Sequence, residues 1–168
     1  VGAIMGKDIT FGTPVVFNSS GSMNYPTAVY DTEADKFVIA FAISGGKCSA
    51  YVGTVSGLTI SFGGEAVICS NGMRTSATYD SLAKNVVIAY MDLDNSNSGT
   101  LVTGTVSGDS ISFGSPVVFN DGSSSNLASF YDPIASRVVV SFQVAGVGHG
   151  AAVTYGVDAG EPNVFAGT

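Results

Sequence analysis

The segment "DLDNSNSG" carries the oxygen-rich side chains best suited to hold a metal ion. Asp92, Asp94, Ser96 and Ser98 place an oxygen at every second position, an alternation that calcium-binding loops also use. Such loops end in a glutamate that binds the ion with both carboxylate oxygens, and no Glu follows here at that distance. We therefore favour a solvated hairpin loop over a calcium site at Asp92, Asp94 and Ser96.

Three Tyr-Asp pairs are the next candidates, since an acid beside a phenol could take part in proton transfer. They are Tyr30-Asp31, Tyr79-Asp80 and Tyr131-Asp132. Each Asp precedes a short polar segment and then an apolar run. An Asp that accepts hydrogen bonds from backbone amides explains one such residue in every turn. We expect these pairs to be structural.

His149, in "GVGHG", is the single histidine. No motif sets a Cys or Ser nucleophile beside it, so a catalytic role has no support. The sequence holds no phosphate-binding loop, dinucleotide fingerprint or zinc spacing. It also lacks Trp and the Asp-box of sialidases. We predict that the chain has no catalytic residues and no cofactor, and that it is not an enzyme.

Composition excludes two classes of partner. The net charge is −7, and only 11% of the residues are charged. Nucleic acid and anionic membranes both require a basic face, so we expect neither. The longest apolar run, Phe37 to Ile43, is too short to cross a bilayer. No basic segment followed by an apolar stretch marks a secretory signal.

A repeat positions all these residues. The phrase "VSGLTISFG" returns as "VSGDSISFG" and, in a more divergent copy, as "IMGKDITFG". The period is about 51 residues, which indicates a repeat architecture. We expect one domain, 1–168, with repeats at about 9–59, 60–110 and 111–158 and an irregular C-terminal tail at 159–168.

Each repeat contains four short runs rich in Val, Ile, Phe, Tyr and Thr, which is typical of strands. In the first complete unit these runs are Pro26 to Asp31, Lys36 to Ile43, Cys48 to Val55 and Ile60 to Cys69. An Asp opens the four-residue turn between the first and second strands. A glycine opens the two-residue turn between the third and fourth, at Gly6, Gly57 and Gly108, which predicts type II′ hairpins.

The second strand of each repeat predicts how the sheets are arranged. "FVIAFAI" and "VVVSF" are apolar at both odd and even positions, so both faces of these strands must be covered. We predict an all-β fold, a β-propeller built of four-stranded antiparallel blades with three blade repeats. A β-sandwich or a β-solenoid built from the same hairpins remains the alternative.

The phrases "GTVSG.SISFG.PVVFN" and "YD....KVVIAY.D" resemble the tandem blade repeats of propeller-like proteins encoded by tailed bacteriophages, notably marine ones. The similarity extends from Val1 to about Val157. It implies a viral protein, located in the virion or in the host cytoplasm. The tail "AGEPNVFAGT" departs from the repeat pattern.

The strands with which the repeat begins and ends predict self-association. The chain opens with third and fourth strands and closes with a first, second and third strand, without a clear fourth. Unpaired strand edges and open apolar faces favour aggregation. We therefore expect a homodimer that completes six blades, in which each N-terminal strand fills the last sheet of its partner.

The hairpin register also predicts the relative positions of the two cysteines. With Gly57-Leu58 as the turn, Cys48 would face Val67, and Cys69 would be its diagonal neighbour. We favour free thiols over a disulfide because of that diagonal geometry and an expected cytosolic origin.

Any ligand site should lie among the variable loops. The turns that join first to second and third to fourth strands are nearly uniform, whereas the other loops differ in length and charge. Recognition is usually carried by loops that vary on a rigid scaffold. The candidate contact residues are Asn24, Tyr25, Arg74, Asp92, Asp94, Asn95, Asn126 and His149.

Two functional hypotheses follow from this. The first is a non-enzymatic recognition module that binds a glycan, a host-surface protein or a virion protein through these loops. The second is a purely structural, self-assembling virion building block. A glycan hydrolase is a third hypothesis, which the sequence favours least.

Overall fold

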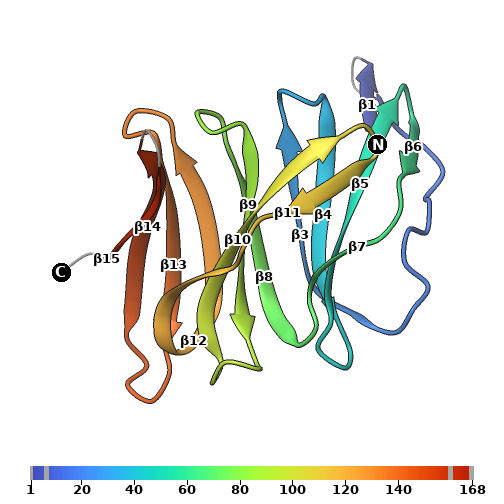
Figure 1. Cartoon of the computed structure of the whole chain (residues 1–168). Coiled ribbons are helices and arrows are strands. Elements are labelled where there is room, and N and C mark those ends of the chain that lie inside the picture. The colour runs from blue at the N-terminus through green and yellow to red at the C-terminus, as the bar shows by residue number, and fades with distance from the viewer. Residues whose placement is uncertain (1, 6–7, 159–160, 167–168) are drawn as a thin grey trace.

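The computed structural model describes residues 2–5, 8–158 and 161–166 of the chain. Over these residues the chain is all-β, with antiparallel strands and no helix. Three sheets are stacked face to face, as the three layers of Figure 1 show. No helix in the described residues could cross a membrane. The sheets form an open stack in the single chain, and the chain does not close into a ring.

The first sheet follows the predicted strand order closely. It contains β3 (Met23–Asp31), β4 (Lys36–Ile43), β5 (Cys48–Ser56), β6 (Thr59–Phe62) and β7 (Ala66–Cys69). Both β6 and β7 pair with β5, so the fourth place of the sheet is occupied by two short strands in succession. Gly63 and Gly64 lie in the break between them.

One long strand connects the second and third sheets. The second sheet contains β8 (Gly72–Asp80), β9 (Asn85–Asp92), β10 (Ser98–Ser107) and β11 (Ser110–Phe113), and the third contains β13 (Arg137–Val144), β14 (Gly150–Asp158) and β15 (Glu161–Ala166). The connecting strand is β12 (Val117–Asp132). It pairs with β10 from Val117 onwards and with β13 from Ser124 onwards.

The C-terminal tail corrects one sequence prediction. We expected residues 159–168 to be irregular, but β15 pairs with β14 from Asp158↔Glu161 to Val153↔Ala166. The physical reason is that β14 would otherwise present a row of unpaired backbone groups at the edge of the sheet. Pro162 is tolerated because β15 is itself an edge strand. The premise of strand exchange, an empty fourth place in the last sheet, is therefore wrong.

The segment after the first hairpin covers part of the outer face of the first sheet. β1 (Gly2–Met5) and β2 (Asp8–Phe11) form a separate hairpin. In the segment that follows, the Phe17 ring packs on Phe41, Tyr51 and Phe62 at centroid distances of 5.7, 5.6 and 5.0 Å. Phe119 is the equivalent of Phe17 two repeats later, and its ring packs on Phe142 of the third sheet at a centroid distance of 5.2 Å.

Two apolar clusters hold the three layers together. One lies between the first and second sheets and includes Val38 and Ile88, and the other lies between the second and third and includes Val87 and Val140. In β9 both odd and even side chains are buried, so the prediction that this strand is covered on both faces is confirmed. Each Val or Ile buried in this way contributes about 1.5–3 kcal/mol.

The turns also behave as predicted. Asp31 Oδ1 accepts hydrogen bonds from the amides of Glu33 and Ala34, both at 3.0 Å. Asp80 and Asp132 likewise accept hydrogen bonds from the amides two and three residues later. These Asp residues are structural. Gly57 and Gly108 both have a φ of 59°, as type II′ turns require. Gly6 lies outside the described residues.

The cysteine register differs from the prediction. Cys48 lies directly opposite Cys69, and Ser49 takes the place opposite Val67. The break at Gly63 and Gly64 shifts the register of β7 by one residue relative to β6, and a second irregularity between Cys48 and Ser49 adds one more. A regular hairpin could not anticipate either. Both cysteines are free, as favoured. Contact with the Cys69 thiol, together with burial, raises the pKa of the Cys48 thiol, which makes it a poor nucleophile.

Gly63 tests the stacking of the first and second sheets. A Cβ on Gly63 would overlap the backbone carbonyl of Asp109, in the neighbouring sheet, whereas a Cβ on Gly64 meets nothing within 4 Å. We predict that Gly63→Ala lowers the free energy of unfolding by about 1–3 kcal/mol, the usual cost of overpacking. Gly64→Ala is the matched control. Urea unfolding checks both, and equal stability of the two variants would contradict the face-to-face stacking.

Candidate functional site

The loops and the turns lie at opposite ends of the stack. At the loop end, the amides of Ser44, Leu93 and Ala145 donate to the carbonyls of Ser22, Asn71 and Ser123, at 2.9, 3.0 and 3.0 Å. These bonds tie the loop after each second strand to the segment before each first strand. The predicted gathering of all variable loops at one end is therefore confirmed.

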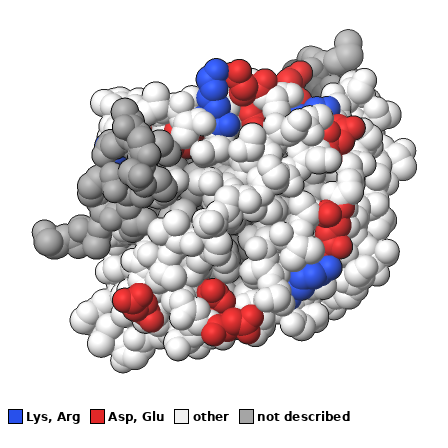
Figure 2. Space-filling view, in the orientation of Figure 1, with Lys and Arg blue, Asp and Glu red and all other residues white. Residues whose placement is uncertain are grey.

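The opposite end, the turn end, carries the uniform turns and most of the ion pairs. Lys36 Nζ lies 3.0 Å from Asp109 Oδ1, and Lys84 Nζ lies 3.1 Å from Glu33 Oε1. Both pairs join the first sheet to the second. Figure 2 shows positive and negative side chains side by side along this upper edge, above a largely uncharged face.

Eight non-glycine residues in the described part of the chain have a left-handed backbone, and three of them stand at equivalent places of the three first strands, near the loop end. Tyr25, Arg74 and Asn126 have φ values of 51°, 60° and 52°. Each occupies a break in the register of a first strand, namely between Asn24 and Thr27 and at the corresponding places of β8 and β12. Left-handed backbone costs a non-glycine residue about 1 kcal/mol. Strain of this kind concentrates at binding sites and other functional positions.

These residues form one row across the three sheets, because the first strands β3, β8 and β12 lie side by side. The guanidinium carbon of Arg74 lies 5.4 Å from the centre of the Tyr25 ring, a cation–π contact. On its other side, Arg74 Nη1 donates to Asn126 Oδ1 at 3.4 Å. We call Tyr25, Arg74 and Asn126 the Arg74 row.

Neighbouring polar groups fix the row in place. Asn126 Nδ2 donates to Gln143 Oε1 at 2.8 Å, which directs Asn126 Oδ1 towards Arg74. Thr75 Oγ1 donates to the carbonyl of Tyr25 at 2.5 Å. The row is thus held by hydrogen bonds within and between the sheets.

The row remains accessible while its centre is partly enclosed. Tyr25 is 45% exposed, Asn126 is exposed and Arg74 is half-buried. The Arg74 Nε atom is buried and has no hydrogen-bond partner. A tyrosine face, a guanidinium and an amide, presented together, can bind a polar ligand with hydrogen bonds and stacking.

The remaining predicted contact residues lie at the loop end but outside the row. Asp92 Oδ1 accepts from the amide of Asp94, and the Asp94 carboxylate accepts from Ser70 Oγ and Asn71 Nδ2 at 3.2 and 2.8 Å. These contacts, with Asn95 and Ser96 exposed, describe a hydrogen-bonded loop. No group of three or more His, Cys, Asp or Glu in the described residues is placed to hold a metal ion.

Asn24 and His149 are both exposed. Asn24 Nδ2 donates to the carbonyl of Ser22 at 3.4 Å, and the carbonyl of His149 accepts from the amide of Val144 at 2.9 Å. Sequence reasoning missed Gln143. The available signal was that Gln143 stands where the other second strands carry Ala42 and Met91.

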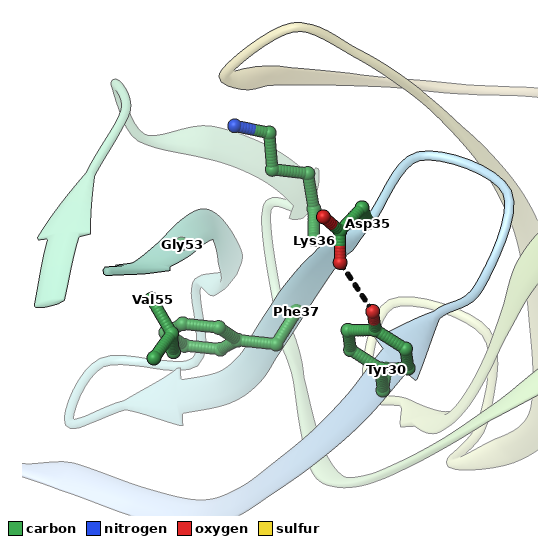
Figure 3. Close-up of a pocket in the computed structure, with 6 residues that line it drawn as sticks. All are labelled: Tyr30, Asp35, Lys36, Phe37, Gly53 and Val55. Atoms are coloured by element: carbon green, nitrogen blue, oxygen red, sulfur yellow. Dashed lines mark hydrogen bonds between the residues drawn. The ribbon is translucent and has the colours of Figure 1, made fainter. Parts of the chain in front are cut away.

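Sequence reasoning also missed a pocket at the turn end, on the outer face of the first sheet (Figure 3). It encloses about 280 Å³ and is lined by Tyr30, Asp35, Lys36, Phe37, Gly53 and Val55. The Tyr30 hydroxyl donates to Asp35 Oδ1. This hydrogen bond raises the pKa of Tyr30 above its usual value.

Comparison with known proteins adds no functional assignment. No protein-family model matches the chain, and a search of curated proteins finds no relative. The function must therefore be argued from the geometry of the chain itself.

The strain in the Arg74 row can be measured with two substitutions at one position. Arg74→Gly and Arg74→Ala both remove the side chain, but only alanine retains the cost of the left-handed backbone. We predict that the glycine variant is more stable than the alanine variant by about 1 kcal/mol. Urea unfolding of the two variants gives this difference, and an alanine variant of equal or greater stability would show that the strain is absent.

Proposed function

We propose that the three sheets are blades of a propeller-type fold and that the chain is a recognition module. It binds a glycan or a protein surface at its loop end and catalyses no reaction. On the resemblance of its repeats to phage-encoded ones, we place it in a virion, or in the host cytoplasm before assembly. Asn24, Asp92, Asp94, Asn95 and His149 would form the outer contacts around the Arg74 row.

The single observation that supports this proposal is the alignment of the Arg74 row. Three different side chains occupy equivalent strained positions, one in each sheet, and each could be replaced by glycine at lower conformational cost. Packing alone does not require a half-exposed tyrosine beside a guanidinium and an amide at the loop end, whereas contact with a ligand would explain it.

A combined variant tests the proposal. Tyr25→Ala, Arg74→Gln and Asn126→Ala together remove the side chains of the row and leave the two apolar clusters intact. Binding to arrays of immobilised glycans and bacterial surface proteins should fall by at least about tenfold, since one lost charged hydrogen bond suffices for that.

The matched control is the double variant Glu33→Gln and Lys84→Gln, which removes an exposed ion pair at the turn end and should leave binding unchanged. If binding depended on the turn end instead, or if no ligand bound the intact chain, recognition at the loop end would be refuted.

Self-assembly is the second candidate function, and the turn-end pocket favours it. Val29 and Tyr79 belong to the same apolar cluster between the first and second sheets. Their repeat equivalents are Phe130 of the third sheet and Tyr30 of the first sheet, which are 56% and 52% exposed. A second copy could bring Phe130 and Tyr30 into one apolar cluster, as Val29 and Tyr79 are between the first and second sheets. Two copies would then provide six blades, without exchange of strands.

Light scattering tests this second candidate. A homodimer would have twice the mass of the 17.0 kDa chain, and Phe130→Ser should shift it towards the monomer by removing apolar contact area. Ile134→Ser is the matched control, since Ile134 is 96% exposed in a turn. A mass of 17.0 kDa at all concentrations, or equal effects of both substitutions, would rule out this interface.

A further inference from the structure

Arg74 differs from the three lysines for which the structure shows an ion pair. Lys36, Lys47 and Lys84 each lie within 3.1 Å of a carboxylate oxygen. In the described residues Arg74 forms no ion pair, and it contacts the Asn126 amide oxygen and the Tyr25 ring instead. A half-buried guanidinium is thus left without a counter-charge in a chain whose net charge is −7.

Partial burial makes this uncompensated charge costly. Removing an ion from water is unfavourable unless an opposite charge or full hydrogen bonding replaces the water. Arg74 Nε is buried with no partner, and the bond from Nη1 to Asn126 is long at 3.4 Å. A bound anion would provide the missing counter-charge, and a guanidinium matches a carboxylate in particular, through two parallel hydrogen bonds.

From these observations we infer that the Arg74 row binds the carboxylate of an acidic sugar residue, such as a uronic acid, within an otherwise neutral glycan. This inference rests on the proposed recognition function and specifies its ligand. The Arg74 guanidinium pairs with the carboxylate. The exposed part of the Tyr25 ring packs on the sugar, and the Asn126 amide bonds its hydroxyls.

The surroundings of the row favour a single carboxylate over a polyanion. Asp94 and Asp121 are exposed at the same end of the stack, and they would repel a densely charged ligand such as a polyphosphate. Neutral hydrogen-bonding side chains surround the row, including Asn24, Ser125 and Gln143. Such groups suit sugar hydroxyls better than the side chains of an acidic peptide.

The test uses the intact chain and an array of glycans that each carry one uronic acid residue. Every glycan is paired with its counterpart in which the carboxyl group is reduced to an alcohol. We expect at least one acidic glycan to bind about tenfold or more tightly than its reduced counterpart. Arg74→Gln should abolish this preference, and Arg74→Lys should retain part of it, because lysine keeps the charge without the planar fork.

Lys84→Gln removes one positive charge from the turn end and should keep the preference in full, which excludes a general effect of net charge. Circular dichroism and urea unfolding establish that each variant is folded. If Arg74→Gln does not fold, Arg74→Lys decides instead. A weaker preference in Arg74→Lys than in Lys84→Gln supports the inference, and an equal preference contradicts it.

Three results would overturn the inference. Equal binding of acidic and reduced glycans would refute the carboxylate contact while leaving glycan recognition intact. Binding of acidic peptides but of no glycan would refute a sugar as the ligand, while leaving the recognition function intact. Absence of binding to all glycans in the array would refute the ligand class, and the combined variant described above decides separately whether the loop end recognises anything.

Discussion

The need to cover both faces of every sheet is the constraint on which the rest of this structure depends. The second strand of the middle sheet shows it most clearly, since Val86, Val87, Ile88 and Ala89 are all fully buried. A single exposed sheet could not hide side chains of both parities. Stacking is therefore obligatory, and it brings the first strands side by side. That proximity creates the Arg74 row, which no sheet could form alone.

The outer faces of the first and third sheets satisfy this constraint differently. On the first sheet, Phe17 fills the place that Phe119 fills between two sheets, and it covers the aromatic side chains of β4 and β5. On the third sheet, Ser141 and Gln143 stand at positions where the preceding sheets carry apolar residues. Terminal units of repeat proteins typically have more polar outer faces. Gln143 thereby serves both as surface and as the partner that orients Asn126.

The repeat allowed much of the fold to be predicted, and local irregularities account for what was missed. Alternation and turn chemistry were sufficient for the strands and for the role of Asp31 and its equivalents. The register at Cys69 was not predictable, because it depends on a break in the fourth strand and on an irregularity between Cys48 and Ser49. The pairing of residues 161–166 was missed because these residues show no apolar repeat pattern. They form a strand by pairing with the backbone of β14.

The candidate site was likewise predictable in part. Variable loops pointed to Tyr25, Arg74 and Asn126 individually, since these residues stand out chemically beside uniform turns. Their alignment could not be predicted, because it requires the bulge in each first strand and the contact between sheets. Nothing in the sequence marks a left-handed tyrosine or arginine, for which glycine would be the usual choice. Gln143 was invisible for a similar reason, since it acts from a different strand.

The most direct test of the central claim is a residue-by-residue map of ligand contact by nuclear magnetic resonance. Backbone amide shifts would be recorded while a uronic acid glycan is titrated into the protein. The account predicts that the largest changes fall on residues 24–27, 73–76 and 125–128, in all three sheets together. Changes confined to the turn end or to the pocket at Tyr30, or the absence of any change, would contradict it.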